Sequence, residues 1–69
     1  MDTKKTHIIA MLNGVPQGYI KSVSYKNGKF KLIQNKYNAK GYTKLDILQS
    51  DIDFLTKYNN HKGYIFIYD

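Results

Sequence analysis

The sequence predicts an α+β fold in the order β-β-β-α-β, with an antiparallel sheet of three to four strands and one helix packed on one face. Two Asn-Gly pairs, Asn13-Gly14 and Asn27-Gly28, each lie between runs of β-branched, aromatic and aliphatic residues. Asn-Gly is the strongest short-range signal for a hairpin, so these pairs predict three strands. Apolar residues at helical spacing after Thr43 predict the helix. Residues 1–69 are expected to form a single small domain.

Three strands are predicted in the first half of the chain. Residues 1–6 are polar and are expected to be frayed, and strands follow at residues 7–12, 15–25 and 29–33. Pro16 has no N–H to donate to a neighbouring strand, which favours a bulge in the second strand at this position.

Each two-residue turn fixes a register, because its flanking residues pair directly. The expected pairs are Leu12–Val15, Ala10–Gln17 and Ile8–Tyr19 in the first hairpin, and Lys26–Lys29, Tyr25–Phe30 and Val23–Leu32 in the second. Counting by twos along the second strand then predicts one core face. Its expected members are Val15, Gln17, Tyr19, Lys21, Val23 and Tyr25, with Ile8, Ala10, Leu12, Phe30 and Leu32 on the neighbouring strands. All except Gln17 and Lys21 are apolar or aromatic, so the registers set by the two turns predict the same core face.

The opposite face of the sheet is expected to be open. Its expected members are His7, Ile9, Met11, Pro16, Gly18, Ile20, Ser22, Ser24, Lys26, Lys29, Lys31 and Ile33. One end of this face is apolar and the other is cationic. The expected pairing of Lys26 with Lys29 sets like charges opposite each other, which is mildly unfavourable unless an anion binds there.

The predicted helix begins after Thr43, a good N-cap, with Asp46 completing a weak capping box. An apolar stripe is expected to cover the sheet; it consists of Leu45, Leu48, Ile52 and Leu55. Asn59 and Asn60 are expected to end the helix. The segment 50–53 contains a second potential helix start, which leaves open a kink there.

Two further features point to a partner. Ile47, Phe54 and Tyr58 are expected on the side of the helix away from the leucines, as a protein-partner patch or a surface covered by the chain's own last strand or a loop. The last strand, predicted at residues 63–68, is apolar on both sides, as expected for a strand buried on two faces or lying beside a partner. A homodimer through either feature is a related expectation.

The chain is basic, with eleven lysines, no arginine and a net charge of +6. Residues expected to contact an anionic partner or nucleic acid are Lys21, Lys26, Lys29, Lys31 and Lys36. Lysine suits non-specific attraction to polyanions better than the reading of bases, which needs the bidentate fork of arginine. The alternative is that these lysines only aid solubility and protect the edges of the sheet.

No constellation predicts catalysis. There is no cysteine, and the two histidines, His7 and His61, are 54 positions apart without nearby ligands. Asp51 and Asp53 point to different sides of a helix, which argues against a paired-carboxylate site. We therefore expect a non-enzyme with no catalytic residue, metal or cofactor. The apolar run 8–12 is too short to cross a membrane, so we expect a cytoplasmic protein with no membrane partner.

The strand order resembles that of small uncharacterised proteins of phages and prophages of low-GC Gram-positive bacteria. The resemblance rests on the Asn-Gly hairpins, the segment 39–44 leading into the helix, and the final segment 63–66. It spans nearly the whole chain and implies no activity. Residues 7–58 also look like the amino-terminal arm-binding domains of tyrosine recombinases, whose sheet enters the DNA major groove.

These observations lead to one expected function and two alternatives. The expected function is that of a non-enzymatic phage or prophage accessory protein which binds a host or phage macromolecule, a protein rather than a nucleic acid. The first alternative is a nucleic-acid-binding module that uses the lysine-rich sheet face. The second is a structural component of the virion.

Overall fold

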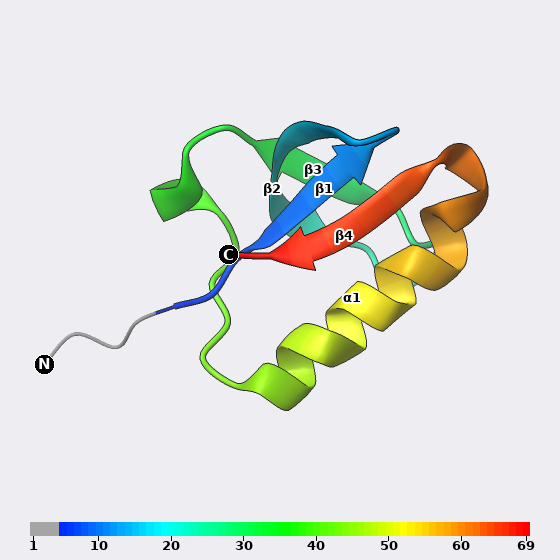
Figure 1. The fold of residues 1–69 in the computed structure, drawn as a ribbon. Helices are drawn as coiled ribbons and strands as arrows, with labels where there is room; N and C mark the ends of the chain where they lie inside the picture. The colour runs from blue at the N-terminus through cyan, green and yellow to red at the C-terminus, as the bar shows by residue number, and fades with distance from the viewer. Residues whose placement is uncertain (1–4) are drawn as a thin grey trace, which may run out of the picture.

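The predicted β-β-β-α-β fold is confirmed: a four-stranded antiparallel sheet carries one helix on one face (Figure 1). The computed structural model describes residues 5–69. The elements are β1 (Ile8–Leu12), β2 (Val15–Val23), β3 (Phe30–Ile33), the short 3₁₀ helix η1 (Lys36–Asn38), α1 (Leu45–Asn59), the 3₁₀ helix η2 (Asn60–Lys62) and β4 (Tyr64–Tyr68). The sheet order is β3-β2-β1-β4, so β3 and β4 form its edges.

A frayed start is expected over residues 1–6, and residues 1–4 of this segment lie outside the described residues. Thr6 is tied to the segment before the helix, since its N–H donates to the Tyr42 carbonyl at 2.9 Å and its carbonyl accepts from the Tyr42 N–H at 2.8 Å. At the other end of the chain, Asp69 exchanges two backbone hydrogen bonds with His7. The start of β1 is therefore held from two sides.

The first hairpin forms the expected two-residue turn, but only one of its three expected residue pairs is observed. Asn13 and Gly14 both have positive φ, 52° and 82°, as a type I′ turn requires, and Leu12 pairs with Val15. The bulge favoured by Pro16 is present, because the register shifts where Met11 pairs with Pro16 and Ala10 with Gly18.

The expected pairs Ala10–Gln17 and Ile8–Tyr19 are therefore wrong: Ile9 pairs with Tyr19. The extra residue, Gln17, moves every later residue of β2 by one place, which exchanges the two faces.

The second hairpin is wider than a two-residue turn. The Ser24 N–H donates to the Lys29 carbonyl at 2.8 Å, which leaves a four-residue loop over 25–28. The expected pairs Lys26–Lys29, Tyr25–Phe30 and Val23–Leu32 are wrong; the observed pairs are Val23–Phe30, Ser22–Lys31, Ile20–Leu32 and Tyr19–Ile33.

Contacts with α1 explain the wider loop. The Asn59 side-chain amide donates to the Gly28 carbonyl at 3.0 Å, and Gly28 lies directly against the Tyr58 side chain. The loop is thereby docked on the C-terminal half of the helix, and the like-charge pairing of Lys26 with Lys29 does not arise.

A second register shift on β2, at Lys21, returns the strand to its original facing. Between the two shifts the faces are exchanged, so Ile20, expected on the open face, is completely buried, and Tyr19, expected in the core, lies on the open face with Ile9 and Ile33. Lys21, Val15 and Tyr25, expected on the core face, are exposed.

The core lies between the sheet and α1, and most of its expected members are there. Its buried apolar residues are Ile8, Ala10, Ile20, Tyr42, Leu48, Ile52, Leu55 and Phe66, with Val23, Phe30, Leu32, Phe54 and Tyr64 packed against them. The stripe of α1 is confirmed at Leu48, Ile52 and Leu55, whereas Leu45 is 71% exposed because it lies in the first turn, before the helix reaches the sheet.

The ends of α1 match the prediction in part. The helix is continuous through 50–53, without a kink, and ends at Asn59 as expected. Its N-cap is Lys44 rather than Thr43, and no side-chain hydrogen bond caps it. Asp46 instead accepts a hydrogen bond from the Ile47 N–H at 2.9 Å. The capping box is therefore wrong, and an exposed first turn tolerates its absence.

Candidate binding surface

The face of the sheet turned away from α1, here called the open face, carries an apolar row that crosses all four strands. Residues of β1 and β4 alternate between the core and this face. Ile9 pairs with Ile67 of β4 on one side and with Tyr19 of β2 on the other, and Tyr19 pairs with Ile33 of β3. These four residues form the apolar row. The sheet order β3-β2-β1-β4 brings together side chains from both ends of the chain.

A shorter row lies beside the first, where Met11 of β1 pairs with Ile65 of β4 and with Pro16 of β2. On β4 the exposed fractions are 60% for Ile65 and 43% for Ile67. The other apolar members, Ile9, Met11, Tyr19 and Ile33, are half-buried, and α1 lies on the opposite face of the sheet (Figure 1). Large apolar groups gathered on one uncovered face are typical of a protein-binding surface.

His7 lies at one end of the open face. Its ring meets the Tyr19 ring edge-on, with 6.2 Å between centroids, and only 8% of the residue is exposed. Its Nδ1 is buried without a hydrogen-bond partner among the described residues. Beside it, Lys36 Nζ forms an ion pair with the Asp69 carboxylate at 2.8 Å. Burial of the ring, with Lys36 nearby, lowers the pKa of His7 below its ordinary value of 6.5.

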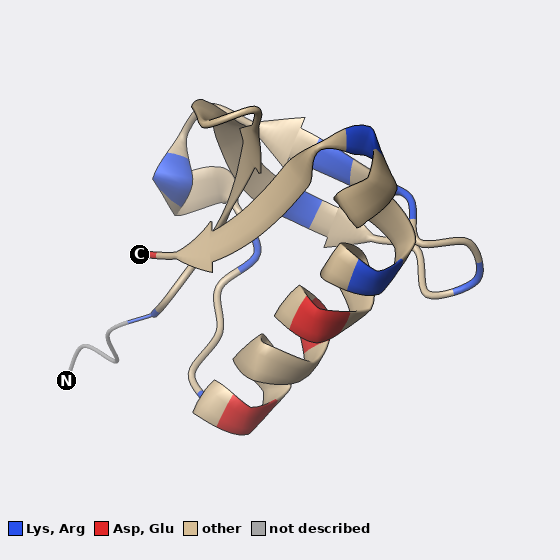
Figure 2. Ribbon diagram, turned by 45° about the vertical axis from the view of Figure 1, so that its right-hand side comes forward, with Lys and Arg blue, Asp and Glu red and all other residues tan. Residues whose placement is uncertain are grey.

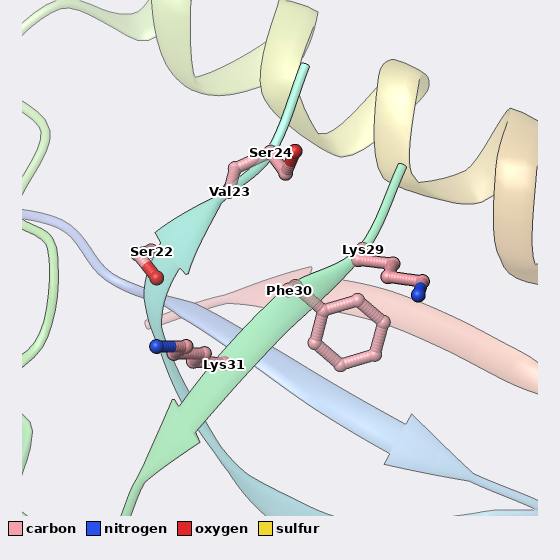
Figure 3. Close-up of a pocket in the computed structure, with 6 residues that line it drawn as sticks. All are labelled: Ser22, Val23, Ser24, Lys29, Phe30 and Lys31. Carbon is pink, nitrogen blue, oxygen red and sulfur yellow. The ribbon is translucent and has the colours of Figure 1, made fainter. Parts of the chain in front are cut away.

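The other end of the open face is cationic. A hollow of about 260 Å³, here called the cationic hollow, is lined by Ser22, Val23, Ser24, Lys29, Phe30 and Lys31. Ser22 pairs with Lys31 across the hairpin, and Figure 3 shows both on one side of the strands, with the Phe30 ring on the other. Two ammonium groups and two hydroxyls can donate to a carboxylate or phosphate, and none of the acidic residues among positions 5–69 lines the hollow.

The structure brings together only two of the five lysines expected to contact an anionic partner. Lys29 and Lys31 share the cationic hollow, while Lys21 lies at the second register shift of β2 and Lys26 in the β2–β3 loop. Lys36 lies in η1 and is paired with Asp69. Figure 2 shows the lysine-bearing segments distributed over the sheet, the loops and the helix end rather than along one track.

The three residues expected to form a protein-partner patch do not lie on one open surface. Phe54 is half-buried, with its ring 5.3 Å from that of Tyr25 and 4.8 Å from that of Tyr58. Tyr58 is partly covered by Gly28. Ile47 remains 49% exposed near the start of α1. The β2–β3 loop therefore covers much of this side of the helix, which is one of the two coverings that the sequence left open.

Sequence reasoning did not find a buried carboxylate cluster, here defined as Asp51, Tyr25, Lys40 and Tyr42. The Asp51 carboxylate is buried in the middle of α1 and accepts hydrogen bonds from the Tyr42 hydroxyl and, at 2.8 Å, from the Tyr25 hydroxyl. Lys40 Nζ lies 3.4 Å from the same oxygen and sits over both tyrosine rings at 5.4 and 5.3 Å.

The cluster shifts two pKa values in directions that favour its present charge state. Burial, followed by the hydrogen bond to Asp51, raises the pKa of Tyr42 above its ordinary value. Burial of Lys40 disfavours its charge, but the hydrogen bond to Tyr25 and the attraction of Asp51 together raise the pKa of Lys40. A hollow of about 230 Å³ is lined by Lys40 and Tyr42 but not by Asp51. We interpret the cluster as a tie between α1, the β2–β3 loop and the 40–42 segment.

The fold and this surface define a small α+β domain whose sheet is covered by a helix on one face and open on the other. Comparison with known proteins gives no match to a family model, to a curated protein or to a solved structure. Among the described residues, no group of three or more His, Cys, Asp or Glu side chains is arranged to hold a metal ion. The one α-helix of residues 5–69 is too short and too polar to cross a membrane.

Proposed function

We propose that this chain is a non-enzymatic accessory protein, of the kind encoded by phages and prophages of low-GC Gram-positive bacteria, which binds a host or phage protein through the open face. The observation that carries the proposal is the apolar row Ile67–Ile9–Tyr19–Ile33 on the only sheet of residues 5–69, in which Ile67 is exposed and the other three residues are half-buried. Covering one exposed isoleucine contributes on the order of 1–2 kcal/mol, so a partner that covers Ile65 and Ile67 gains affinity at this face.

The cationic hollow adds a second requirement for the partner. Lys29 and Lys31 adjoin the same face, and neither is in an ion pair within the described residues. A complementary partner therefore presents an apolar patch with acidic residues at one end. Such charge complementarity favours orientation and the rate of association more than affinity.

The test is an affinity pull-down from nuclease-treated host lysate, with mass spectrometry. The double variant Ile65→Thr, Ile67→Thr keeps β-branched residues in β4 and removes apolar groups from the open face. The matched control Val15→Thr changes an exposed residue of β2 at the far end of the first hairpin. We expect a captured protein to be lost with the double variant and kept with the control. Capture that is the same for all three chains contradicts the proposal.

The alternative function, nucleic-acid binding, has one observation in its favour: the serine and lysine donors of the cationic hollow suit phosphate oxygens. Two lysines predict a shallow salt dependence, with about 1.4 units of log affinity lost per tenfold rise in salt for a single strand. Titration of a fluorescent oligonucleotide at low ionic strength tests it. The absence of salt-sensitive binding removes this alternative.

A further inference from the structure

A second hollow lies off the open face, between the edge strand β3 and the corner that joins α1 to β4. It has a volume of about 500 Å³ and is here called the edge groove, lined by Lys29, Phe30, Leu32, Asn59, Lys62 and Tyr64. Its lining comes from two regions about thirty positions apart in the sequence, so sequence patterns did not reveal it. Of its residues, only Lys29 and Phe30 also border the cationic hollow.

The edge groove combines an apolar floor with a cationic rim. The Phe30 ring packs edge-on against Tyr64 at 5.2 Å and against Phe66 at 5.4 Å between centroids. Lys29 and Lys62 are exposed, and the part of the chain that the structure describes places no acidic residue in the lining of the groove. The ion pairs of residues 5–69, Lys36–Asp69 and Lys40–Asp51, involve neither rim lysine. The groove therefore suits a ligand with both apolar and carboxylate groups.

The backbone of β3 is open along the same groove. Within the described sheet β3 pairs with β2 alone, so its second edge has no strand beside it. Because Lys29 accepts the Ser24 N–H across the hairpin, alternation along β3 directs the N–H and C=O groups of Phe30 and Leu32 away from β2. Unpaired groups at a sheet edge can bond an added strand.

The groove is preformed by contacts that do not require a ligand. Asn59, in its lining, donates to the Gly28 carbonyl at 3.0 Å and to the Leu55 carbonyl at 2.9 Å, and so holds the β2–β3 loop on the helix. The start of β3 is thereby fixed relative to η2 and β4. A preformed site lowers the ordering cost of binding.

We propose that the edge groove binds an extended acidic segment of a partner protein, which adds as a strand to β3 and places alternate apolar side chains on Phe30, Leu32 and Tyr64. A second copy of this chain is disfavoured as the occupant, because pairing β3 with β3 sets lysines against lysines. Single-stranded nucleic acid is disfavoured, because the unpaired backbone groups at the edge of β3 match an added peptide strand and only two lysines line the groove to follow phosphates.

The test uses fluorescence anisotropy with a labelled peptide of alternating aspartate and valine, about eight residues long. We expect saturable binding by the full chain and at least about a tenfold loss of affinity for Lys62→Glu, which reverses a rim charge. Lys44→Glu makes the same charge change in the segment before α1, away from the groove, and is the matched control. Circular dichroism spectra equal to that of the natural chain establish that both variants are folded.

A second measurement leaves the protein unchanged. N-methylation of alternate peptide residues blocks one edge of the added strand, so methylating one set of positions is expected to abolish binding and methylating the other to preserve it. Equal effects of the two sets contradict strand addition. So does an equal loss for Lys44→Glu and Lys62→Glu, or tighter groove binding by a thymidine oligonucleotide than by the peptide.

The inference goes beyond the open-face function and can fail independently of it. The variant Ile65→Thr, Ile67→Thr changes the open face and is expected to leave peptide binding unchanged. If that variant abolishes peptide binding, the peptide occupies the open face, and the edge-groove proposal is overturned while the open-face function stands.

Discussion

His7 is a buried side chain whose charge state affects stability. Its surroundings contain Lys36, Lys5, Asp69 and Tyr19, and burial is the largest cause of its lowered pKa. The unfolded chain therefore takes up a proton at a higher pH than the folded chain. The contribution of the neutral ring to stability is complete above pH 6.5 and is lost as the pH falls through the lower pKa of the folded state.

We expect the free energy of unfolding to decline from pH 7.5 to pH 5 more steeply for the natural chain than for His7→Phe. Urea denaturation at several pH values measures it. The matched control is His61→Gln, which changes an exposed histidine in η2. The same pH dependence in His7→Phe and in the natural chain contradicts the account of this residue.

The carboxylate cluster predicts a large loss of stability when the Asp51 carboxylate is replaced by an amide. Asp51→Asn keeps the size of the side chain but removes the charge that Tyr25, Tyr42 and Lys40 all contact. We expect a loss of about 2–3 kcal/mol in the free energy of unfolding. Asp53→Asn, on the exposed side of the same helix, is expected to cost less than about 0.5 kcal/mol. Similar values for the two variants in urea denaturation contradict a stabilising cluster.

The cluster was hidden in the sequence because its members are connected only by the tertiary structure. Asp51 lies 26 positions from Tyr25 and 9 from Tyr42. On a helix wheel it appears as a solvated acid beside the apolar stripe. Only the docking of the β2–β3 loop and the 40–42 segment on α1 converts it into a buried acceptor.

At the scale of the elements, strand and helix positions follow from the sequence, whereas register does not. The turn at Asn13-Gly14, the stripe of α1 and the α1 terminus at Asn59 were predictable from local chemistry. The shifts at Gln17 and Lys21 were not located in full, because Pro16 indicated only the first. Two bulges exchange the faces of β2 and then restore them. The predicted core face is therefore correct at Val23 and along β1 and β3, but it is inverted at the middle of β2, and Val15 and Tyr25 are exposed.

The docking of the second loop on α1 predicts different costs for two glycine substitutions. Gly14 and Gly28 both have positive φ, 82° and 73°, so alanine is strained at each. An added Cβ meets nothing within 4 Å at Gly14 but overlaps the Tyr58 Cβ and Cγ at Gly28. We expect a loss of about 1 kcal/mol for Gly14→Ala and about 3 kcal/mol for Gly28→Ala. Equal losses in urea denaturation contradict close docking of this loop.

At the scale of the whole molecule, the sequence predicted the architecture but located the candidate surface only in part. The row Ile67–Ile9–Tyr19–Ile33 depends on the order of the strands and on a bulge, neither of which a single hairpin determines. Of the expected lysine surface, Lys29 and Lys31 come together, while Lys36 is paired elsewhere. Charge is readable from sequence, but its clustering depends on the fold.

The open face also predicts weak self-association of the free protein. Exposed Ile65 and Ile67 are covered when two copies meet, while the net charge of +6 opposes close approach. We expect the weight-average sedimentation coefficient to rise with concentration and with salt, and Ile65→Thr, Ile67→Thr to reduce the rise. A monomer at every concentration and salt level contradicts this prediction.

The central claim is that the open face is the working surface, and photo-crosslinking tests it most directly. A photoreactive amino acid at Ile67, on the open face, is compared with the same group at Leu45, which is exposed at the start of α1. Irradiation in host lysate is predicted to attach a partner protein from position 67 and not from position 45. Attachment of a specific partner from position 45 alone contradicts the claim.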